Sequence, residues 1–389
     1  MKSVALFRFF LESSLPFAHM QLSSQGFLFY FRTMFDTLAT ALRQAYPQFT
    51  DAALSCTPFG EGLIHETLLL RQAEKKWILQ GFNDSVFRYP DRIDHNLSLL
   101  SSHKADPLLP FQLPLPLPNA QGTGLTRIEG KYYRLFDFVE GKTLQQIEQP
   151  AQARLAAQAY GKFAAWAAKL PAAALQDTIP NFHHLDLRFA RLVEVAKQAP
   201  PLPQDEQALL QSYLDQQPLV DWYLEQLPLL PLRTTHNDTK INNLIFASSL
   251  DSVQALVDLD TLMAGYLMYD FGDLVRTVAC SQPETSNAWD QVALLPDLFE
   301  ELLNGYWQGL DGALSPAEAN SLRHGGAVMT LIMGLRFLTD HLEGNVYYRV
   351  SYPEQNLHRA KNQLALLQSQ HAQSAALDAC WRRVQAINA

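Results

Sequence analysis

Two spacings of hydrophobic residues divide this chain into a β-rich part and a helical part. From Asp36 to Tyr46 the apolar residues recur at the interval of a helix, and a second helix is expected over residues 90–103. Short apolar runs bounded by turn residues predict four strands, over residues 63–71, 77–82, 124–128 and 132–138. We therefore expect mostly antiparallel sheet with one or two helices up to Phe138.

In the rest of the chain the spacing becomes helical. Six segments carry apolar residues at helical intervals, over residues 151–170, 188–199, 204–226, 295–308, 316–338 and 357–387. They are interrupted over residues 232–273, where two short apolar strands, 243–246 and 253–259, are bounded by dense polar residues. The pattern predicts an α+β protein with a β-rich N-lobe over residues 34–138 and a mainly helical C-lobe over residues 139–389.

Residues 1–33 precede this pattern and fit neither part. Basic residues flank a broken apolar run there, as in a signal peptide or a short anchor. Glu12 and Pro16 interrupt that run, and the sequence has no stretch of about 18 uninterrupted apolar residues to cross a bilayer. We favour Met34 as an alternative start, because an amphipathic helix begins there, and leave the role of residues 1–33 open.

Composition and charge narrow the range of partners. Of the 389 residues, 48% are hydrophobic, which is ordinary for a globular protein and excludes disorder or a fibrous repeat. Acidic residues outnumber basic ones, 39 to 30, and no dense run of Lys or Arg is present, so we expect no nucleic-acid partner. Cys56, Cys280 and Cys380 form neither a metal pattern nor a disulfide framework, which favours a reducing, cytoplasmic setting.

Four polar residues in the interrupted segment have the spacing of a phosphoryl-transfer site. His236, Asp238 and Asn243 form H-x-D-x-x-x-x-N, and Asp258 follows at the end of an apolar strand. In phosphoryl transfer one carboxylate orients the attacking hydroxyl, while an amide and a second carboxylate hold Mg²⁺ on the nucleotide phosphates. We assign the first role to Asp238 and the metal to Asn243 and Asp258, whose oxygens are hard ligands. His236 is interpreted as bracing the backbone of the loop.

A competing explanation is that Asp and Asn gather in turns because their side chains satisfy nearby backbone groups. That explanation accounts poorly for three acids, Asp238, Asp258 and Asp260, around two short strands. Asp260 would share a face with Asp258 if the strand continued, whereas a turn would direct it elsewhere. Three further charged residues are expected to form an ion-pair and capping network that fixes this loop: Asp270, Asp273 and Arg276.

With these residues in place, the chain resembles the aminoglycoside phosphotransferase-like family of small-molecule kinases, which shares the bilobal protein-kinase-like fold. The likeness covers most of the chain between Met34 and Tyr348. Residues 59–70, FGEGLIHETLLL, are similar to the family's glycine loop. There Gly60 and Gly62 would let backbone amides approach the triphosphate of ATP, since no Cβ intervenes.

Two strands carry further parts of the resemblance. Residues 133–141, YRLFDFVEG, are similar to the strand that enters the hinge, where backbone groups near Phe136 and Phe138 would hold the adenine. Residues 77–80, WILQ, depart from the kinase pattern, because Gln80 stands where kinases carry a lysine toward the phosphates. An amide brings no charge. The chain is therefore a weak or silent kinase, or it belongs to a branch without this lysine.

A closer resemblance, to the N-acetylhexosamine 1-kinase branch, favours the second interpretation. It is carried by residues 77–97, 179–189, 235–243, 257–276 and 334–348. The branch phosphorylates the anomeric hydroxyl of an N-acetylated hexosamine with ATP and Mg²⁺, and its corresponding strand also ends in Leu-Gln, so Gln80 conforms. By this resemblance Asp238 is the base, and Arg336 and Tyr347 contact the sugar. Leu63 departs from the branch, which often has histidine there.

Several alternatives remain open. Arg336 lies four residues before Asp340, and an i, i+4 salt bridge on a helix would explain it equally well. We predict ATP- and Mg²⁺-dependent phosphorylation of a small-molecule acceptor, a sugar, at its anomeric hydroxyl, with no nucleic acid and no membrane involved. The alternatives are a kinase of an amino alcohol or aminoglycoside, and a silent nucleotide-binding pseudokinase. The sequence leaves the oligomeric state open.

Overall fold

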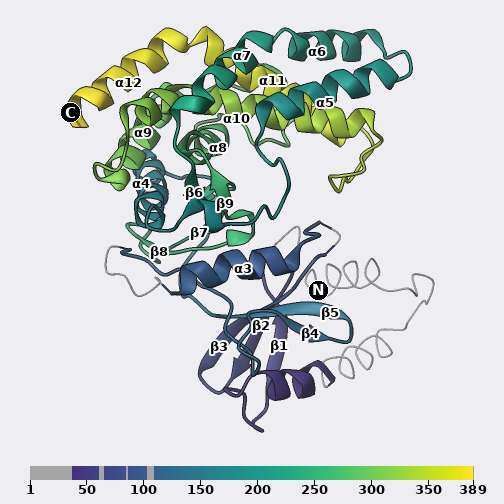
Figure 1. The fold of residues 1–389 in the computed structure, drawn as a ribbon, viewed down its shortest axis with the longest axis vertical. Coiled ribbons are helices and arrows are strands. Elements are labelled where there is room, and N and C mark those ends of the chain that lie inside the picture. The colour runs from purple at the N-terminus through teal and green to yellow at the C-terminus, as the bar shows by residue number, and fades with distance from the viewer. Residues whose placement is uncertain (1–36, 61–64, 85, 103–108, 389) are drawn as a thin grey trace. The chain divides into compact units, whose positions relative to one another are not determined.

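The computed structural model describes residues 37–60, 65–84, 86–102 and 109–388, which form two compact units (Figure 1). The first contains the described residues up to Val86 together with Leu115–Phe138; the second contains Phe87–Pro114 and the chain from Val139 onward. The predicted α+β organisation is confirmed, since the first unit is mainly antiparallel sheet and the second mainly helical. Some predictions lie outside the described residues, namely those on residues 1–33, Met34, Gly62 and Leu63.

The first unit is built on a five-stranded antiparallel sheet with the order β1-β2-β3-β5-β4. Its strands are β1 (Ser55–Pro58), β2 (Glu66–Gln72), β3 (Lys75–Gly81), β4 (Thr126–Ile128) and β5 (Lys131–Asp137). The pairs β2/β3 and β4/β5 are the predicted ones, and each is closed by a short turn. The sequence does not predict β1, because this edge strand is mostly exposed and ends in a proline.

One helix, over residues 37–45, packs on this sheet. Leu38, Leu42 and Tyr46 are buried in a cluster with strand residues such as Leu70, which confirms the helical spacing predicted there. The Tyr46 hydroxyl accepts a hydrogen bond from Thr126 Oγ1 at 2.9 Å. The buried phenol therefore has a polar partner, as a close-packed core requires.

The second unit consists mainly of helices. They are α3 (Pro90–Ser101), α4 (Pro150–Ala167), α5 (Leu185–Gln198), α6 (Gln204–Leu214), α7 (Gln217–Gln226), α8 (Leu267–Val278), α9 (Pro296–Leu310), α10 (Pro316–Leu342), α11 (Gln355–Ala372) and α12 (Ser374–Asn388). The helix predicted over 204–226 is two helices, because Pro218 at the start of α7 has no N–H to continue the ladder of α6. The helix predicted over 357–387 likewise divides, at Gln373.

Helix α3 belongs to the second unit, although it follows the first strands in sequence. The Asn96 side chain donates hydrogen bonds of 2.8 Å to the backbone oxygens of both Gln176 and Leu262. Because Asn96 is buried, these bonds fix α3 to segments that lie far away in sequence.

Four short strands occupy the predicted interruption between the helices. They are β6 (Arg233–Thr235), β7 (Leu244–Phe246), β8 (Val253–Leu256) and β9 (Met263–Gly265), paired β6 with β9 and β7 with β8. Strand β6 contacts both α4 and α8, and β8 contacts α4 (Figure 1). The strand predicted to run to Leu259 ends at Leu256, because the chain turns at Asp258, whose φ is 62°. This turn decides where the acidic side chains of the segment lie.

Helices α4 and α9 pack with their backbones in direct contact. A Cβ atom at Gly305 would lie 2.2 Å from the carbonyl oxygen of Arg154, and one at Gly309 would lie 2.4 Å from that of Gln158. These distances are shorter than any non-bonded contact, so these positions accept no larger residue without moving a helix. Helix α4 also contacts β6, the strand that precedes the polar segment. The close packing against α9 therefore fixes the position of the helix on which this segment rests.

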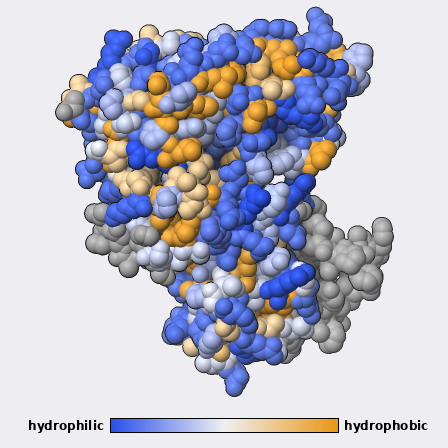
Figure 2. Space-filling model, viewed as in Figure 1, coloured by the Kyte–Doolittle hydropathy of each residue, from blue (hydrophilic) through white to orange (hydrophobic). Residues whose placement is uncertain are grey.

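Figure 2 shows polar and apolar residues interspersed on the visible face of the second unit. Large apolar side chains that are exposed include Leu229, Leu232 and Val346. Within the residues that the structure describes, no helix combines the length and apolar character needed to cross a bilayer.

The α4–α9 contact leads to a stability prediction. Gly305→Ala should lower the free energy of unfolding by about 1–3 kcal/mol or more, because the added methyl group overpacks the contact. Urea unfolding of both proteins measures the difference. Gln308→Ala, on the exposed side of α9, is the matched control and should change stability by less than about 0.5 kcal/mol. Equal stability of the Gly305 variant and the wild type would contradict the close packing.

Candidate active site

The polar segment after β6 is held by the carboxylate of Asp270 in α8. Its two oxygens accept hydrogen bonds from the consecutive backbone N–H groups of His236 (3.0 Å) and Asn237 (2.8 Å). Burial raises the pKa of Asp270 to about 6, although the His236 ring and the two N–H groups act in the opposite direction. Asp270 therefore braces the loop, and the expectation that it would cap a helix start is corrected.

His236 is buried and braces the same loop, as the sequence predicts. Its Nε2 lies 3.1 Å from the backbone oxygen of Val257, and its Nδ1 accepts from the Asp238 N–H at 3.3 Å. The ring also packs edge-on against Tyr160, with the centroids 5.4 Å apart. With both nitrogens engaged by backbone groups, the imidazole positions the loop and is not available as a base.

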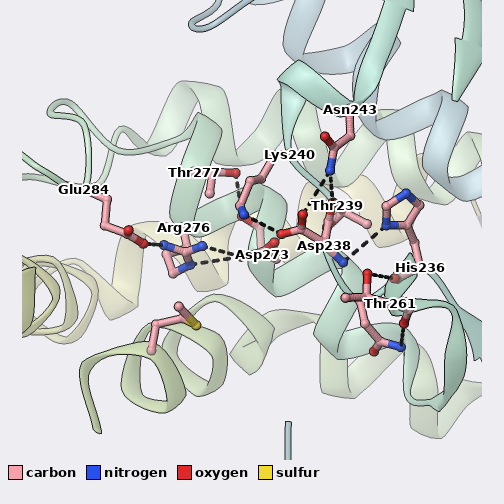
Figure 3. Close-up of polar contacts among 12 residues, drawn as sticks. His236, Asp238, Thr239, Lys240, Asn243, Thr261, Asp273, Arg276, Thr277 and Glu284 are labelled. Atoms are coloured by element: carbon pink, nitrogen blue, oxygen red, sulfur yellow. Dashed lines mark hydrogen bonds and ion pairs between the residues drawn. The ribbon is translucent and has the colours of Figure 1, made fainter. Parts of the chain in front are cut away.

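Asp238 lies at the centre of a compact polar group (Figure 3). The Asn243 side chain donates to the Asp238 backbone oxygen at 2.9 Å and to its Oδ2 at 3.1 Å, while the Lys240 ammonium lies 2.5 Å from Oδ1. Burial by itself would raise the pKa of Asp238, but Lys240 and the Asn243 amide lower it below its ordinary value. The carboxylate is therefore ionised at neutral pH and can accept a proton or orient a hydroxyl.

Lys240 is a candidate functional residue that the sequence analysis misses. Burial lowers its pKa, but Asp238 and Asp273 raise it more, so its side chain stays charged. A lysine two residues after the proposed base is visible in the sequence, yet it is typical of any polar loop. The ion pair with Asp238, which appears in the folded chain, is what identifies it (Figure 3).

The pair proposed for Mg²⁺, Asn243 and Asp258, is brought together by the β7–β8 hairpin. The Val257 N–H donates to the Asn243 backbone oxygen at 2.9 Å, so the next residue, Asp258, begins beside Asn243. Because the Asn243 amide nitrogen faces Asp238, its carbonyl oxygen points away from that carboxylate. Asp258 is exposed, and a left-handed backbone directs the chain away from the strand at this residue.

The donor set fits a hard divalent cation. Mg²⁺ is usually bound by one or two protein oxygens together with waters and substrate phosphates, and a carboxamide plus a carboxylate supply such oxygens. The described residues contain no group of three or more His, Cys, Asp or Glu side chains in metal-binding geometry. Asp260 is buried on a 3-10 turn (Leu259–Thr261), so the alternative in which it shares a strand face with Asp258 is wrong.

A buried network of alternating charges lies next to this loop. Arg276 pairs with Asp273 at 2.7 Å and with Glu284 (Figure 3). Arg359 pairs with the other oxygen of Glu284. Burial raises the pKa of Glu284, but the Arg359 and Arg276 guanidiniums lower it to about 2. The predicted pairing of Asp273 with Arg276 is confirmed, and Glu284 extends it toward α11.

In the first unit, Gln80 has a cation beside it. Gln80 on β3 lies directly opposite Arg134 on β5, and the Arg134 guanidinium donates to the Gln80 side-chain oxygen. Arg134 is 2% exposed and lies against the rings of Phe82 and Phe136. The sequence analysis misses Arg134, because the register between two strands fifty residues apart cannot be read from composition.

The other proposed nucleotide contacts also lie in this unit. Gly60 has φ of 76°, a conformation that favours glycine and turns the loop after β1. Phe138, just after β5, packs edge-on against Phe59, and its N–H donates to the Lys76 backbone oxygen at 3.4 Å. Phe136 is paired with Ile78 within the sheet. Adenine binding by this segment stays a prediction.

The proposed sugar contacts, Arg336 and Tyr347, lie together in the second unit. The Arg336 guanidinium carbon is 5.4 Å from the centroid of Tyr347 and 5.3 Å from that of Tyr348. Asp340 accepts hydrogen bonds from the backbone N–H groups of Tyr347 (2.6 Å) and Tyr348 (3.0 Å). The alternative salt bridge between Arg336 and Asp340 is therefore wrong, and Asp340 instead shapes the turn that carries the two tyrosines.

Comparison with known proteins bears on the fold of the chain. A family model described as the phosphotransferase enzyme family matches residues 55–313. A microcompartment-associated aminopropanol kinase is 18% identical with a TM-score of 0.60, covering 87% of this chain and 98% of its own. A choline kinase from Cryptosporidium parvum Iowa II is 12% identical with a TM-score of 0.57, covering 90% and 99%. Aminoglycoside 2′-phosphotransferase-IIIa, in its GDP complex, is 14% identical with a TM-score of 0.56, covering 84% and 97%. These likenesses confirm the predicted kinase-like fold.

The buried charge network predicts how stability depends on pH. Because the pKa of Glu284 falls from 4.5 to about 2 on folding, its charge contributes about 3 kcal/mol above pH 4.5. That contribution is lost as the pH falls toward 2. The margin in free energy of unfolding between wild type and Glu284→Gln, measured in urea from pH 7 to 3, should therefore shrink below pH 4.5.

Glu194→Gln is the control for this series. Glu194 forms an exposed pair with Arg191, and such a pair contributes about 0–1 kcal/mol. Its variant should differ little from the wild type across the same range. A margin for the Glu284 variant that stays constant down to pH 3 would be inconsistent with a depressed pKa in the folded state.

Proposed function

The chain belongs to the phosphotransferase enzyme family, and from this premise we propose that it phosphorylates a sugar with ATP. The proposed acceptor is the anomeric hydroxyl of an N-acetylhexosamine or a related hexose, and the product is a sugar 1-phosphate. The single observation that carries the proposal is the ionised Asp238, held between Lys240 and Asn243 on a braced loop. We place the reaction in the cytoplasm, which the three free thiols of the chain support.

In this mechanism Asp238 orients the acceptor hydroxyl for in-line attack and receives its proton as the phosphoryl group is transferred. Phosphoryl transfer passes through a loose transition state, so positioning and charge neutralisation contribute most of the rate. Lys240, next to Asp238, supplies a fixed positive charge for the oxygens of the transferred group. Asn243 and Asp258 would hold Mg²⁺, which neutralises charge on the phosphates when it is bound.

The proposed nucleotide contacts are the residues of the first unit. Gly60 and Gly62 would let backbone amides approach the phosphates, and Phe136 and Phe138 mark the segment proposed for the adenine. The charge that kinases usually place on the third strand would come from Arg134, which holds the Gln80 side chain. This arrangement argues against a silent pseudokinase, since Gln80 was the main support for that alternative.

The acceptor site favours a sugar over an amino alcohol or aminoglycoside. A cationic acceptor calls for carboxylates, whereas the proposed acceptor residues are Arg336 and Tyr347. Arg336 would repel an ammonium group, while a guanidinium and aromatic rings readily contact sugar hydroxyls and ring faces. The aminopropanol and choline kinases with a similar fold keep the amino-alcohol alternative as the comparison for the experiment.

The central test is transfer from Mg·ATP to a panel of free sugars, amino sugars and amino alcohols, with the products identified by phosphorus NMR. We expect a sugar 1-phosphate signal. Asp238→Asn should lower kcat by about 10³-fold or more, because the substitution removes the orienting carboxylate but keeps the shape of the side chain. Asp251→Asn, an exposed carboxylate that accepts from Ser249 and Ser252, is the matched control and should keep normal turnover.

Three results would contradict the proposal. Normal turnover by the Asp238 variant would remove the proposed base, and transfer to amino alcohols alone would replace the acceptor. Binding of Mg·ATP with no transfer to any compound would instead support a silent nucleotide-binding protein.

A second test concerns the charge beside Gln80. Arg134→Gln should raise the KM for ATP about tenfold or more and leave the KM for the acceptor unchanged, because charge near the phosphates is lost. Arg134→Lys should retain part of the affinity. Arg127→Gln on the exposed side of β4 is the control. A structural role for Arg134 would lower the active fraction without changing the KM for ATP, and that result would exclude the proposed role.

A further inference from the structure

Two arginines from different helices converge on one phenylalanine in the second unit. Arg336 of α10 lies with its guanidinium carbon 4.7 Å from the ring centroid of Phe182. Arg188 of α5 donates from Nη2 to the backbone oxygen of the same Phe182 at 3.3 Å. The two side chains therefore occupy one small region, next to the turn that carries Tyr347 and Tyr348.

Neither guanidinium is neutralised by a carboxylate among the described residues. Arg336 is 8% exposed, and its hydrogen bond goes to the uncharged sulfur of Met333 at 3.4 Å. The burial of Arg188 and the charge of Arg336 lower the pKa of Arg188 to about 10. Buried arginines are normally paired, because removing a charge from water is costly. Two like charges held together without an anion mark a place where an anion would bind.

Three polar atoms around this pair also have no hydrogen-bond partner among the described residues. They are the Arg188 Nε, the His183 Nδ1 and the Tyr348 hydroxyl. His183 is 5% exposed, and its Nε2 is fixed 2.9 Å from the backbone oxygen of Asn237. Burial is the main cause that lowers the pKa of His183 to about 3, so the ring is neutral and its Nδ1 is an acceptor. Unsatisfied buried polar atoms are costly, and a ligand with hydroxyl and anionic groups would satisfy them.

We propose that Arg188 and Arg336 form an oxyanion subsite, which binds a carboxylate or phosphate group carried by the acceptor. The planar guanidinium presents paired N–H donors that match the two oxygens of such a group. Tyr347 is half exposed, so a ligand can reach the pair from solvent. This inference rests on the proposed sugar-kinase function and makes it more specific, because the accepted sugar bears a negative charge.

The subsite lies close to the proposed base within the same unit. His183 contacts Asn237, the residue before Asp238, and the charges of Arg336, Arg188 and Asp238 all act on the His183 ring. An acceptor that binds the arginines through its anionic group thus lies near the loop that carries Asp238. The rings of Tyr347 and Tyr348 already face Arg336, so they do not form a cage for an ammonium group.

The experiment compares four acceptors built on one pyranose ring: N-acetylglucosamine, glucosamine, glucuronic acid and N-acetylglucosamine 6-phosphate. We expect kcat/KM to be at least tenfold higher for the preferred anionic sugar than for N-acetylglucosamine, and lowest for glucosamine. The two anionic arms separate a carboxylate from a phosphate. In Arg188→Gln the preference should disappear, because the KM for the anionic sugar rises at least tenfold more than the KM for N-acetylglucosamine.

Arg191→Gln is the matched control, since Arg191 lies on the same helix but forms exposed ion pairs with Glu194 and Glu343. It should keep the full preference. Arg188→Lys should restore part of it, because the charge returns without the paired donors. Equal kcat/KM for neutral and anionic sugars, or an equal loss for all sugars in Arg188→Gln, would overturn the subsite and leave the sugar kinase intact.

Direct binding separates this inference from the proposed function. Calorimetry with glucuronic acid and with sodium sulfate should detect binding to the wild type that is lost in Arg188→Gln and kept in Arg191→Gln. If none of the four sugars is phosphorylated yet this binding is observed, the proposed function fails and the anion subsite stands. If no anion binds the wild type, the subsite is excluded whatever the turnover.

Discussion

The arrangement of the whole polar segment depends on the carboxylate of Asp270 and the two backbone N–H groups that it accepts. Those groups belong to His236 and Asn237, and Asn237 takes a left-handed conformation, φ 63°, at that point. One buried carboxylate thereby satisfies two donors that would otherwise be buried without partners, which offsets its own loss of hydration. With the loop fixed there, Asp238 has a defined direction, and Lys240 and Asn243 reach it from the following turn.

The structure places positive charges near the proposed site, although the sequence lacks the usual kinase lysine at Gln80. Gln80 lacks the charge of a lysine, but the adjacent strand places Arg134 against it. Lys240 adds a second cation beside Asp238, in the other unit. Arg188 and Arg336 add a third group that has no counterion among the described residues. Arg134 and Arg336 are held against aromatic rings, and Lys240 is held by its ion pair with Asp238. Arg188 is held by its hydrogen bond to the Phe182 backbone oxygen, so each charge has a fixed position.

Features that depend on residues close together in the sequence were predictable, and features that depend on distant residues were not. The helix that carries Leu42, the pair β2/β3 and the segment from His236 to Asn243 were predictable because each signal is local, in spacing or in motif. Pro218 indicated that residues 204–226 form two helices, but the apolar spacing on both sides of it predicted one continuous helix. The sequence did not indicate why Gly305 and Gly309 are glycines. The reason is visible only in the structure, where α4 packs directly against these positions of α9.

By itself the sequence determined the α+β organisation and the kinase-like motifs, and from those motifs Asp238, Asn243 and Asp258 are proposed as the chemical residues. These follow from residue type and from spacing along the chain, which no folding step can change. The tertiary structure alone decided that Asp270 braces the loop, that Asp340 holds the Tyr347 turn, and that Arg134 faces Gln80. It also decided that Arg336 has no ion-pair partner in the described part of the chain. The contacts of Asp270 and Arg134 join residues far apart in sequence, whose distance depends on helix packing or strand register, and both are set by the burial of the whole core. The Asp340 contact closes the turn that follows α10.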